Sequence, residues 1–182
     1  MKYRLTDMVL ETECGLVLHR IRALRDIPEH GVTAGDLGGW IESERNLAQS
    51  DNAWVYGYAR VYGNARVYGN AQVFGDAQVY GNAQVYGYAR VYGNAHIAGN
   101  ARLLSRNSVF TASYVGTENG VLTVMSGVSG LVVTCGCFTG SADEFLERSR
   151  TVHDDKTHNE YRMLIEVAKS RIPVHAVPDT ED

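Results

Sequence analysis

A six-residue motif repeats ten times without interruption between residues 55 and 114. Each copy begins with an aliphatic residue, and in the first eight copies glycine is third and alanine is fifth. So short a period predicts a parallel β-solenoid, because a chain wound in regular coils returns every sixth residue to the same environment. Such a fold offers flat faces and ladders of side chains rather than a deep cleft.

The repeat also predicts which side chains fill the interior. The aliphatic residue at position one and the alanine at position five are the large and small partners that a narrow triangular core requires. Glycine at position three, followed by asparagine or aspartate in most copies, favours the unusual backbone angles of a corner. If three hexads make one coil, residues eighteen apart stack at the inter-strand spacing of roughly 4.8 Å.

The repeat divides the chain into three parts. We assign residues 1–50 to an N-terminal β cap, 51–120 to the solenoid and 121–182 to a C-terminal cap. Caps are expected because the open ends of a solenoid expose unpaired strand edges and core residues.

The C-terminal cap is predicted to contain a hairpin followed by two short helices. Capping-box sequences at Ser141-x-x-Glu and Thr157-x-x-Glu place the helices at about residues 142–150 and 158–172. An apolar stripe on the second helix would seal the last coil, and Pro173 ends that helix. The stripe contains Tyr161, Leu164, Ile165, Ala168 and Ile172.

The hexads resemble the left-handed parallel β-helix of the hexapeptide-repeat proteins, in which a small residue follows four positions after an aliphatic one. The resemblance covers about a third of the chain and implies an all-β, left-handed triangular solenoid. Position two departs from the common pattern, since it carries tyrosine or phenylalanine. The chain also resembles uncharacterised enterobacterial and prophage-encoded β-helix proteins, on residues 38–44, the Val-Tyr-Gly-Asn-Ala repeats and residues 136–145. That resemblance implies a phage or prophage accessory protein in the host cytoplasm.

The charge pattern separates the middle of the chain from its ends. Residues 51–114 hold five arginines and two aspartates, whereas the whole chain has a net charge of −4. This excess is too small for a protein that binds duplex nucleic acid through a basic patch. No apolar run is long enough to predict a membrane helix or a signal peptide, so we expect a cytoplasmic protein with reduced cysteines.

The aromatic residues at position two form ladders on the outside of the predicted coils. Cross-strand stacking alone stabilises such pairs by about 0.2–1 kcal/mol each. A large aromatic face also favours self-association, and the resemblance to hexapeptide-repeat proteins implies a homotrimer. The residues assigned to this oligomer interface are Tyr56, Phe74, Tyr92 and Phe110.

Position six supplies polar and basic residues beside the tyrosines. Arginine recognises phosphate and aromatic rings stack on bases, so the interleaved ladders predict binding of an anionic small molecule such as a nucleotide. The alternative is a solvated polar edge that keeps the sheet soluble. The predicted ligand-binding residues are Arg60, Arg66, Arg90, Arg102, His96, Tyr62, Tyr68, Tyr80 and Tyr86.

Catalytic, metal and redox sites are weakly supported. Acyltransferases of the hexapeptide-repeat family use a histidine base and a loop that leaves the coils, whereas these hexads run unbroken with His96 as their one histidine. His153 and His158 are poorly spaced for a metal, and Cys135-Gly-Cys137 is better explained by small buried thiols in a tight turn. We therefore expect no catalytic residues, no metal and no cofactor.

These features together predict a non-enzymatic, phage- or prophage-encoded binding protein. It would act as a counter-defence or host-interaction factor that sequesters an anionic ligand, such as a signalling nucleotide, in grooves between subunits. An inhibitor or scaffold that binds a host or defence protein is the second hypothesis. A hexapeptide-type acyltransferase is the third.

Overall fold

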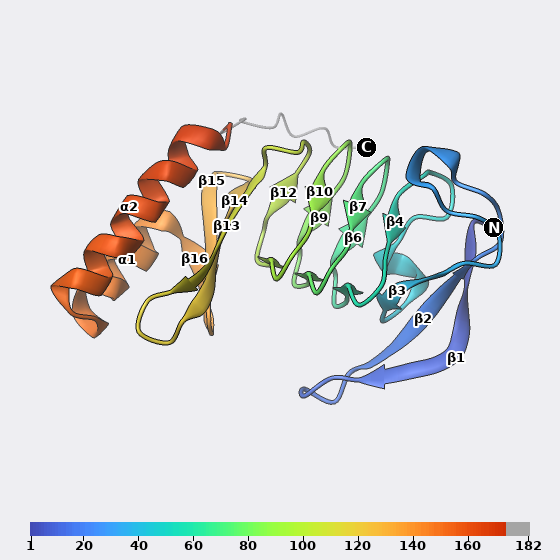
Figure 1. Ribbon diagram of the computed structural model, residues 1–182, viewed down its shortest axis with the longest axis horizontal. Helices are drawn as coiled ribbons and strands as arrows, with labels where there is room; N and C mark the ends of the chain where they lie inside the picture. Colours follow the sequence, from blue (N-terminus) through green and yellow to red (C-terminus); the bar gives the residue numbers. More distant parts are fainter. Residues whose placement is uncertain (174–182) are drawn as a thin grey trace.

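The hexads form a β-solenoid in which every copy from residue 54 to residue 103 contributes one two-residue strand (Figure 1). The computed structural model describes residues 1–173. Parallel pairing joins strands whose residues are eighteen apart, as Trp54, Gln72 and Arg90 are. The rungs are β4 (Trp54–Val55), β5 (Arg60–Val61), β6 (Arg66–Val67), β7 (Gln72–Val73), β8 (Gln78–Val79), β9 (Gln84–Val85), β10 (Arg90–Val91), β11 (His96–Ile97) and β12 (Arg102–Leu103).

The interior follows the predicted large and small alternation. The aliphatic residues at position one and the alanines at position five are at most 1% exposed throughout residues 55–103. The eight glycines at position three have positive φ angles of 54° to 74°, which places the corners in the left-handed region. The predicted β-solenoid fold and its core are therefore confirmed.

The N-terminal cap continues one sheet of the solenoid. Its strands are β1 (Tyr3–Glu11), β2 (Val17–Ala23) and β3 (Leu37–Ile41), and β3 pairs in parallel with β5. Two 3-10 turns complete it, η1 (Pro28–His30) and η2 (Glu44–Asn46).

Side chains of the cap satisfy the open backbone edge of the first coil. Lys2 Nζ donates to Ala53 O at 2.6 Å and pairs with Asp51 at 2.9 Å, while Asn46 Nδ2 donates to Ala65 O at 2.9 Å. Lys2 is fully buried, and burial lowers the pKa of its ammonium. These polar contacts replace the strand that would otherwise pair there.

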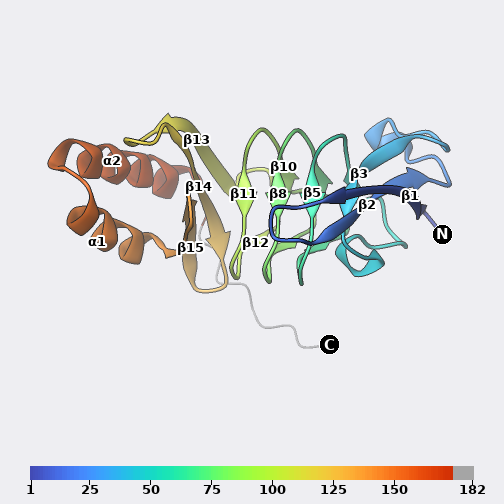
Figure 2. The ribbon, with the colours of Figure 1, turned by 90° about the horizontal axis from the view of Figure 1, so that it is seen from below.

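An antiparallel sheet closes the other end. It consists of β13 (Val109–Val115), β14 (Gly120–Gly127), β15 (Gly130–Cys135) and β16 (Phe138–Ser141), in sequence order. The sheet lies between the last coil and the helices (Figures 1 and 2).

Hydroxyl groups of the sheet bind the exposed backbone of the last coil. Thr134 Oγ1 donates to His96 O at 2.7 Å, Thr123 Oγ1 accepts from His96 N at 3.2 Å, and Ser126 Oγ donates to Arg102 O at 2.6 Å. Both threonines are buried, so the hydroxyls stand in for the next parallel strand.

The tenth hexad is not a rung, and the solenoid ends before the predicted boundary at residue 120. Val109 instead begins β13, which pairs antiparallel with β14. The ninth and tenth copies lack the glycine and alanine of positions three and five, so neither the sharp corner nor the small core residue is available.

Two helices, α1 (Ala142–Val152) and α2 (Asp155–Arg171), cover the outer face of this sheet (Figure 2). Ser141 forms the predicted capping box with Glu144. The capping prediction at Thr157 is wrong: Asp154 is the N-cap residue, and its side chain accepts a hydrogen bond from Thr157 N. Four residues of the predicted stripe are buried in the core between helix and sheet: Tyr161, Ile165, Ala168 and Ile172. Neither described helix is long and apolar enough to cross a membrane.

Candidate functional site

One corner of the solenoid carries a column of polar side chains at the eighteen-residue spacing. Asn52, Asn70, Tyr88 and Arg106 occupy equivalent positions on successive coils, and Asn52 Nδ2 donates to Asn70 Oδ1 at 3.3 Å. Together with Gln72 and Arg90 from the adjoining rungs and Glu29 and His30 from η1, this column lines a hollow of about 530 Å³. We call this hollow the corner groove.

Arg90 is held in a defined orientation within the corner groove. Its Nε donates to Gln72 Oε1 at 2.9 Å, and its guanidinium carbon lies 5.7 Å from the centroid of the Phe74 ring. Within residues 1–173 its two terminal nitrogens have no hydrogen-bond partner. They are therefore free to donate to an anion.

The orientation of Arg90 is linked to the N-terminal cap through Gln72. Since the Gln72 oxygen accepts from Arg90, its amide nitrogen is the group that contacts His30 Nδ1. His30 Nδ1 must then accept, which leaves the proton on Nε2. That Nε2 atom is buried and has no hydrogen-bond partner among residues 1–173.

The corner groove combines positive charge with an exposed aromatic ring. Arg90 and Arg106 contribute two positive charges against the single carboxylate of Glu29. Tyr88 is 69% exposed. Its backbone N–H donates to Leu104 O at 3.0 Å, and this hydrogen bond joins the coil of Tyr88 to the segment that bears Arg106. The arrangement provides donors for an anion and a flat surface for a ring.

The predicted ligand-binding residues do not lie together in the structure. Arg90 is the one residue of that set that lines the corner groove. Arg66 lies in a separate hollow of about 540 Å³ with Glu42 and Arg45. Arg60 and His96 belong to the sheet of β5, β8 and β11, and Arg102 to the sheet of β6, β9 and β12.

The predicted tyrosines pair with one another on these other two faces. Tyr62 stacks on Tyr80 with centroids 5.3 Å apart, and Tyr68 stacks on Tyr86 at 5.0 Å. The Tyr62 hydroxyl donates to Gln78 Oε1 at 3.0 Å, and burial raises the pKa of Tyr62 to about 12. These side chains contact each other along the solenoid.

The residues assigned to an oligomer interface form a shorter column than predicted. Tyr56 meets Phe74 edge-on at 6.3 Å, and Phe74 stacks on Tyr92 at 5.5 Å. Phe110 does not continue the column, because it lies on β13 and packs into the second core, with the helices. Tyr92 ends the column and is 59% exposed.

Most residues of the corner groove were missed in the sequence. Position four of the repeat, taken at eighteen-residue spacing, predicts one column of Asn52, Asn70, Tyr88 and Arg106. Tyr88 was an available signal, since it replaces the usual asparagine or aspartate. His30 gave none, because only the folded cap brings it to Gln72.

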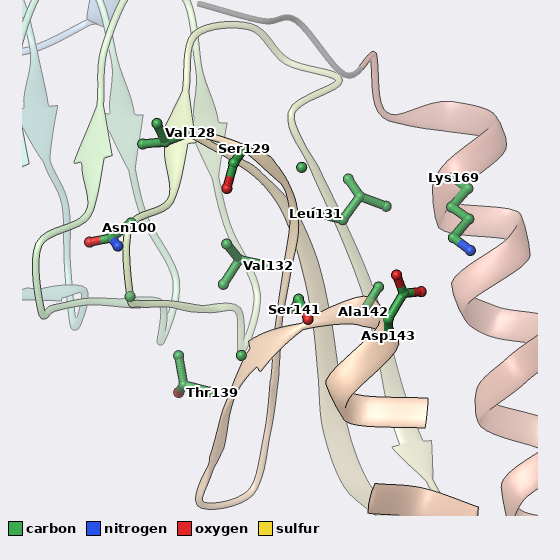
Figure 3. A pocket seen from close by; sticks show the side chains of 13 residues that line it. Asn100, Val128, Ser129, Leu131, Val132, Thr139, Ser141, Ala142, Asp143 and Lys169 are labelled. Carbon is green, nitrogen blue, oxygen red and sulfur yellow. The ribbon is translucent and has the colours of Figure 1, made fainter. Parts of the chain in front are cut away.

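Another hollow, of about 610 Å³, lies between the last coil and the C-terminal cap (Figure 3). Asn100 lines its solenoid side, while Asp143 and Lys169 face it from the helices (Figure 3). Lys169 is paired with Glu166 at 3.1 Å. Because its charges are balanced, this hollow is a weaker candidate for an anion than the corner groove.

The remaining histidines and cysteines are dispersed. Within residues 1–173 no group of three His, Cys, Asp or Glu side chains is arranged to hold a metal ion. His158 Nδ1 contacts Ser149 Oγ at 3.3 Å, and His153 packs beside Tyr161. Cys135 is half-buried and Cys137 is exposed, so the expectation that both thiols are buried is wrong for Cys137.

The comparison with protein families agrees with this fold. Residues 59–75 and 77–90 match the model of the YdcK beta solenoid repeat. Both segments lie within the rungs of the solenoid, so the match concerns the repeat and neither cap. No curated protein matches the chain significantly.

Proposed function

We propose that this protein is a non-enzymatic binding protein that holds a nucleotide-like anion in the corner groove. The observation that carries this proposal is Arg90, which Gln72 orients while its terminal nitrogens stay available beside the exposed ring of Tyr88. A phosphate would accept from Arg90 and Arg106, and a base would stack on Tyr88.

The dimensions of the corner groove favour a nucleotide over a bare phosphate. Its column spans four coils, which is roughly 14 Å at the spacing of parallel strands. The amides of Asn52 and Asn70 and the carboxylate of Glu29 lie along the same column and suit the hydroxyl groups of a sugar. A single phosphate would leave most of these groups without a partner.

The biological part of the proposal is supported by the sequence resemblances. A prophage-encoded hexapeptide-repeat protein in the host cytoplasm, acting as a counter-defence factor, would lower the concentration of a signalling nucleotide by binding it. The column of Tyr56, Phe74 and Tyr92 adjoins the rungs that bear Gln72 and Arg90. A homotrimer formed through that column would place a corner groove near each subunit boundary.

Isothermal titration calorimetry with adenosine monophosphate, cyclic mononucleotides and neutral adenosine tests this proposal. We expect the nucleotides to bind, and Arg90→Gln and Arg106→Gln each to weaken binding by at least about tenfold, as the loss of a charge-assisted hydrogen bond predicts. Arg66→Gln is the matched control, because Arg66 holds an equivalent place in the repeat but lines a different hollow.

Two results would overturn the proposal. One is a folded protein that binds none of these nucleotides. The other is an equal loss of affinity in Arg66→Gln and Arg90→Gln, which would show that overall charge, rather than the corner groove, attracts the ligand.

A further inference from the structure

A second cavity, remote from the corner groove in sequence and fold, lies in the C-terminal cap between the sheet and the two helices. It measures about 280 Å³. Its apolar lining comes from Val115 on β13, Phe138 on β16, Phe145 and Val152 on α1, and Tyr161 on α2. The cavity thus depends on elements that pack together only in the folded cap.

The aromatic walls of this cavity support one another. Phe145 lies 5.2 Å from Phe138 and meets Tyr161 edge-on at 5.0 Å. The Tyr161 hydroxyl contacts the thiol of Cys135 at 3.8 Å and fits closely over Gly116, where a Cβ atom would collide with it. The cavity is therefore preformed, as ligand sites usually are.

The lining also contains an arginine that forms no ion pair with the lining carboxylate. The guanidinium carbon of Arg148 lies 6.0 Å from the centroid of the Phe138 ring, so its charge is beside the apolar walls. Among residues 1–173 Arg148 forms no salt bridge. Glu118 is the one carboxylate of the lining, and His153 packs 5.6 Å from Tyr161.

From these observations we infer that the cavity binds a small carboxylic acid with an apolar body. Its volume is roughly twice that of an apolar cavity that accepts benzene, which suits one aromatic ring or a chain of about six to eight carbons. The body would contact Phe138, Phe145 and Tyr161, and the carboxylate would accept from Arg148. Binding is non-covalent.

Cys135 serves as a reporter for this cavity. Burial raises the pKa of its thiol, which therefore stays protonated at neutral pH and reacts slowly. Cys14 is exposed on the N-terminal cap and is an internal reference. Alkylation by iodoacetamide, followed by tandem mass spectrometry that distinguishes Cys135 from Cys137 within their shared peptide, measures the rates at Cys135 and Cys14 in the same sample.

Benzoate and octanoate are the probes, with benzyl alcohol as the neutral control. We expect a saturating acid to slow alkylation of Cys135 at least about fivefold and to leave Cys14 unchanged, since an occupant covers the cavity lining and does not reach the N-terminal cap. Unchanged alkylation of Cys135 with both acids, together with no heat of binding by calorimetry, would overturn the inference. So would equal slowing of Cys14.

A pair of helix variants tests the role of charge. Arg148→Gln should weaken carboxylate binding at least about tenfold and leave benzyl alcohol binding unchanged, because only the acid needs the guanidinium. Arg150→Gln, on the same helix but outside the lining, should bind the acids as the parent does. Equal losses in the two variants would contradict the assignment of Arg148. Nucleotide binding at the corner groove should be the same in both, so the two proposals fail separately.

Discussion

His96 shows how one residue of the repeat takes on a structural task. Its backbone N–H and C=O are bound by Thr123 and Thr134, and its ring is half-buried with its edge toward Tyr80. Burial lowers the pKa of the imidazole below its usual value of 6.5. The folded state therefore favours the neutral ring.

This pKa shift predicts acid sensitivity. Well above pH 6.5 the ring is neutral in both the folded and the unfolded state, so its titration does not lower the free energy of unfolding. As the pH falls from 6.5 through the lower pKa of the folded state, the unfolded chain takes up the proton first, so the free energy of unfolding decreases. Urea denaturation measures the free energy of unfolding at pH 7.5 and at pH 5.5. The decrease between these two pH values should be smaller for His96→Gln than for the parent protein. Glutamine is the chosen replacement because Gln78 holds the equivalent position on the adjoining rung. Equal decreases in the two proteins would contradict this account.

Thr157 shows why residue-level predictions can fail. Ser-x-x-Glu and Thr-x-x-Glu look alike in the sequence, and only the first is a capping box in the structure. Asp154 caps α2 three residues earlier than expected and leaves Thr157 buried inside the helix. A local motif cannot choose between two adjacent caps when tertiary packing selects the phase of the helix.

Among the elements, the corners of the solenoid explain why the glycines are spaced so regularly. Successive corners stack directly on one another, so an added Cβ atom at Gly75 would lie 3.0 Å from Gly93 N. At Gly57, in the first hexad, an added Cβ atom meets nothing within 4 Å. The two glycines have φ angles of 73° and 54°, so both lie in the left-handed region.

This contrast separates two costs of replacing glycine. Gly57→Ala should lower the free energy of unfolding by about 1 kcal/mol, the usual cost of a side chain at positive φ. Gly75→Ala adds a contact with the backbone of the next coil, and we expect it to lose roughly a further 1 kcal/mol or more. Urea denaturation of both variants measures the difference. Equal losses would mean that stacking of the corners contributes nothing.

The junction at Leu103 is an element boundary that periodicity could not locate. Aliphatic residues continue at position one through Val109, so the periodicity predicts a tenth copy in the solenoid. The informative change was the loss of corner glycine and core alanine after residue 101. The chain then turns back as β13 to pair with β14, a choice made by long-range contacts.

At the scale of the whole molecule, the solenoid, the sheet and the helices lie in line along the long axis, with a cap at each end (Figure 1). The corner groove needs both the solenoid and the N-terminal cap, since His30 reaches Gln72 across forty-two residues of sequence. The cavity of the C-terminal cap needs neither. Two separate binding regions on one chain are therefore compatible with the architecture.

The aromatic column predicts self-association of the whole molecule. Light scattering should give a mass of about three times the 20.0 kDa chain, since a closed ring of three subunits uses one such face per subunit. Tyr92→Ser should lower that mass, because Tyr92 is the exposed end of the column of Tyr56 and Phe74. Tyr58→Ser is the matched control, an exposed tyrosine outside the column. A monomer of 20.0 kDa at micromolar concentration would exclude the trimer.

Sequence alone determined the solenoid, its core residues, its corners and its stacked ladders. The reason is that the same residue types recur every six positions, so each coil has the same core residues and the same corner. Tertiary structure decided where the coils stop, how hydroxyls and amides bind their open edges, and which columns meet the caps. Arg90 is an example: its position in the repeat could be predicted from the sequence, whereas its orientation depends on contacts with Gln72 and, through Gln72, with His30. Contacts between residues far apart in the chain do not recur at regular intervals, so the repeat does not predict them.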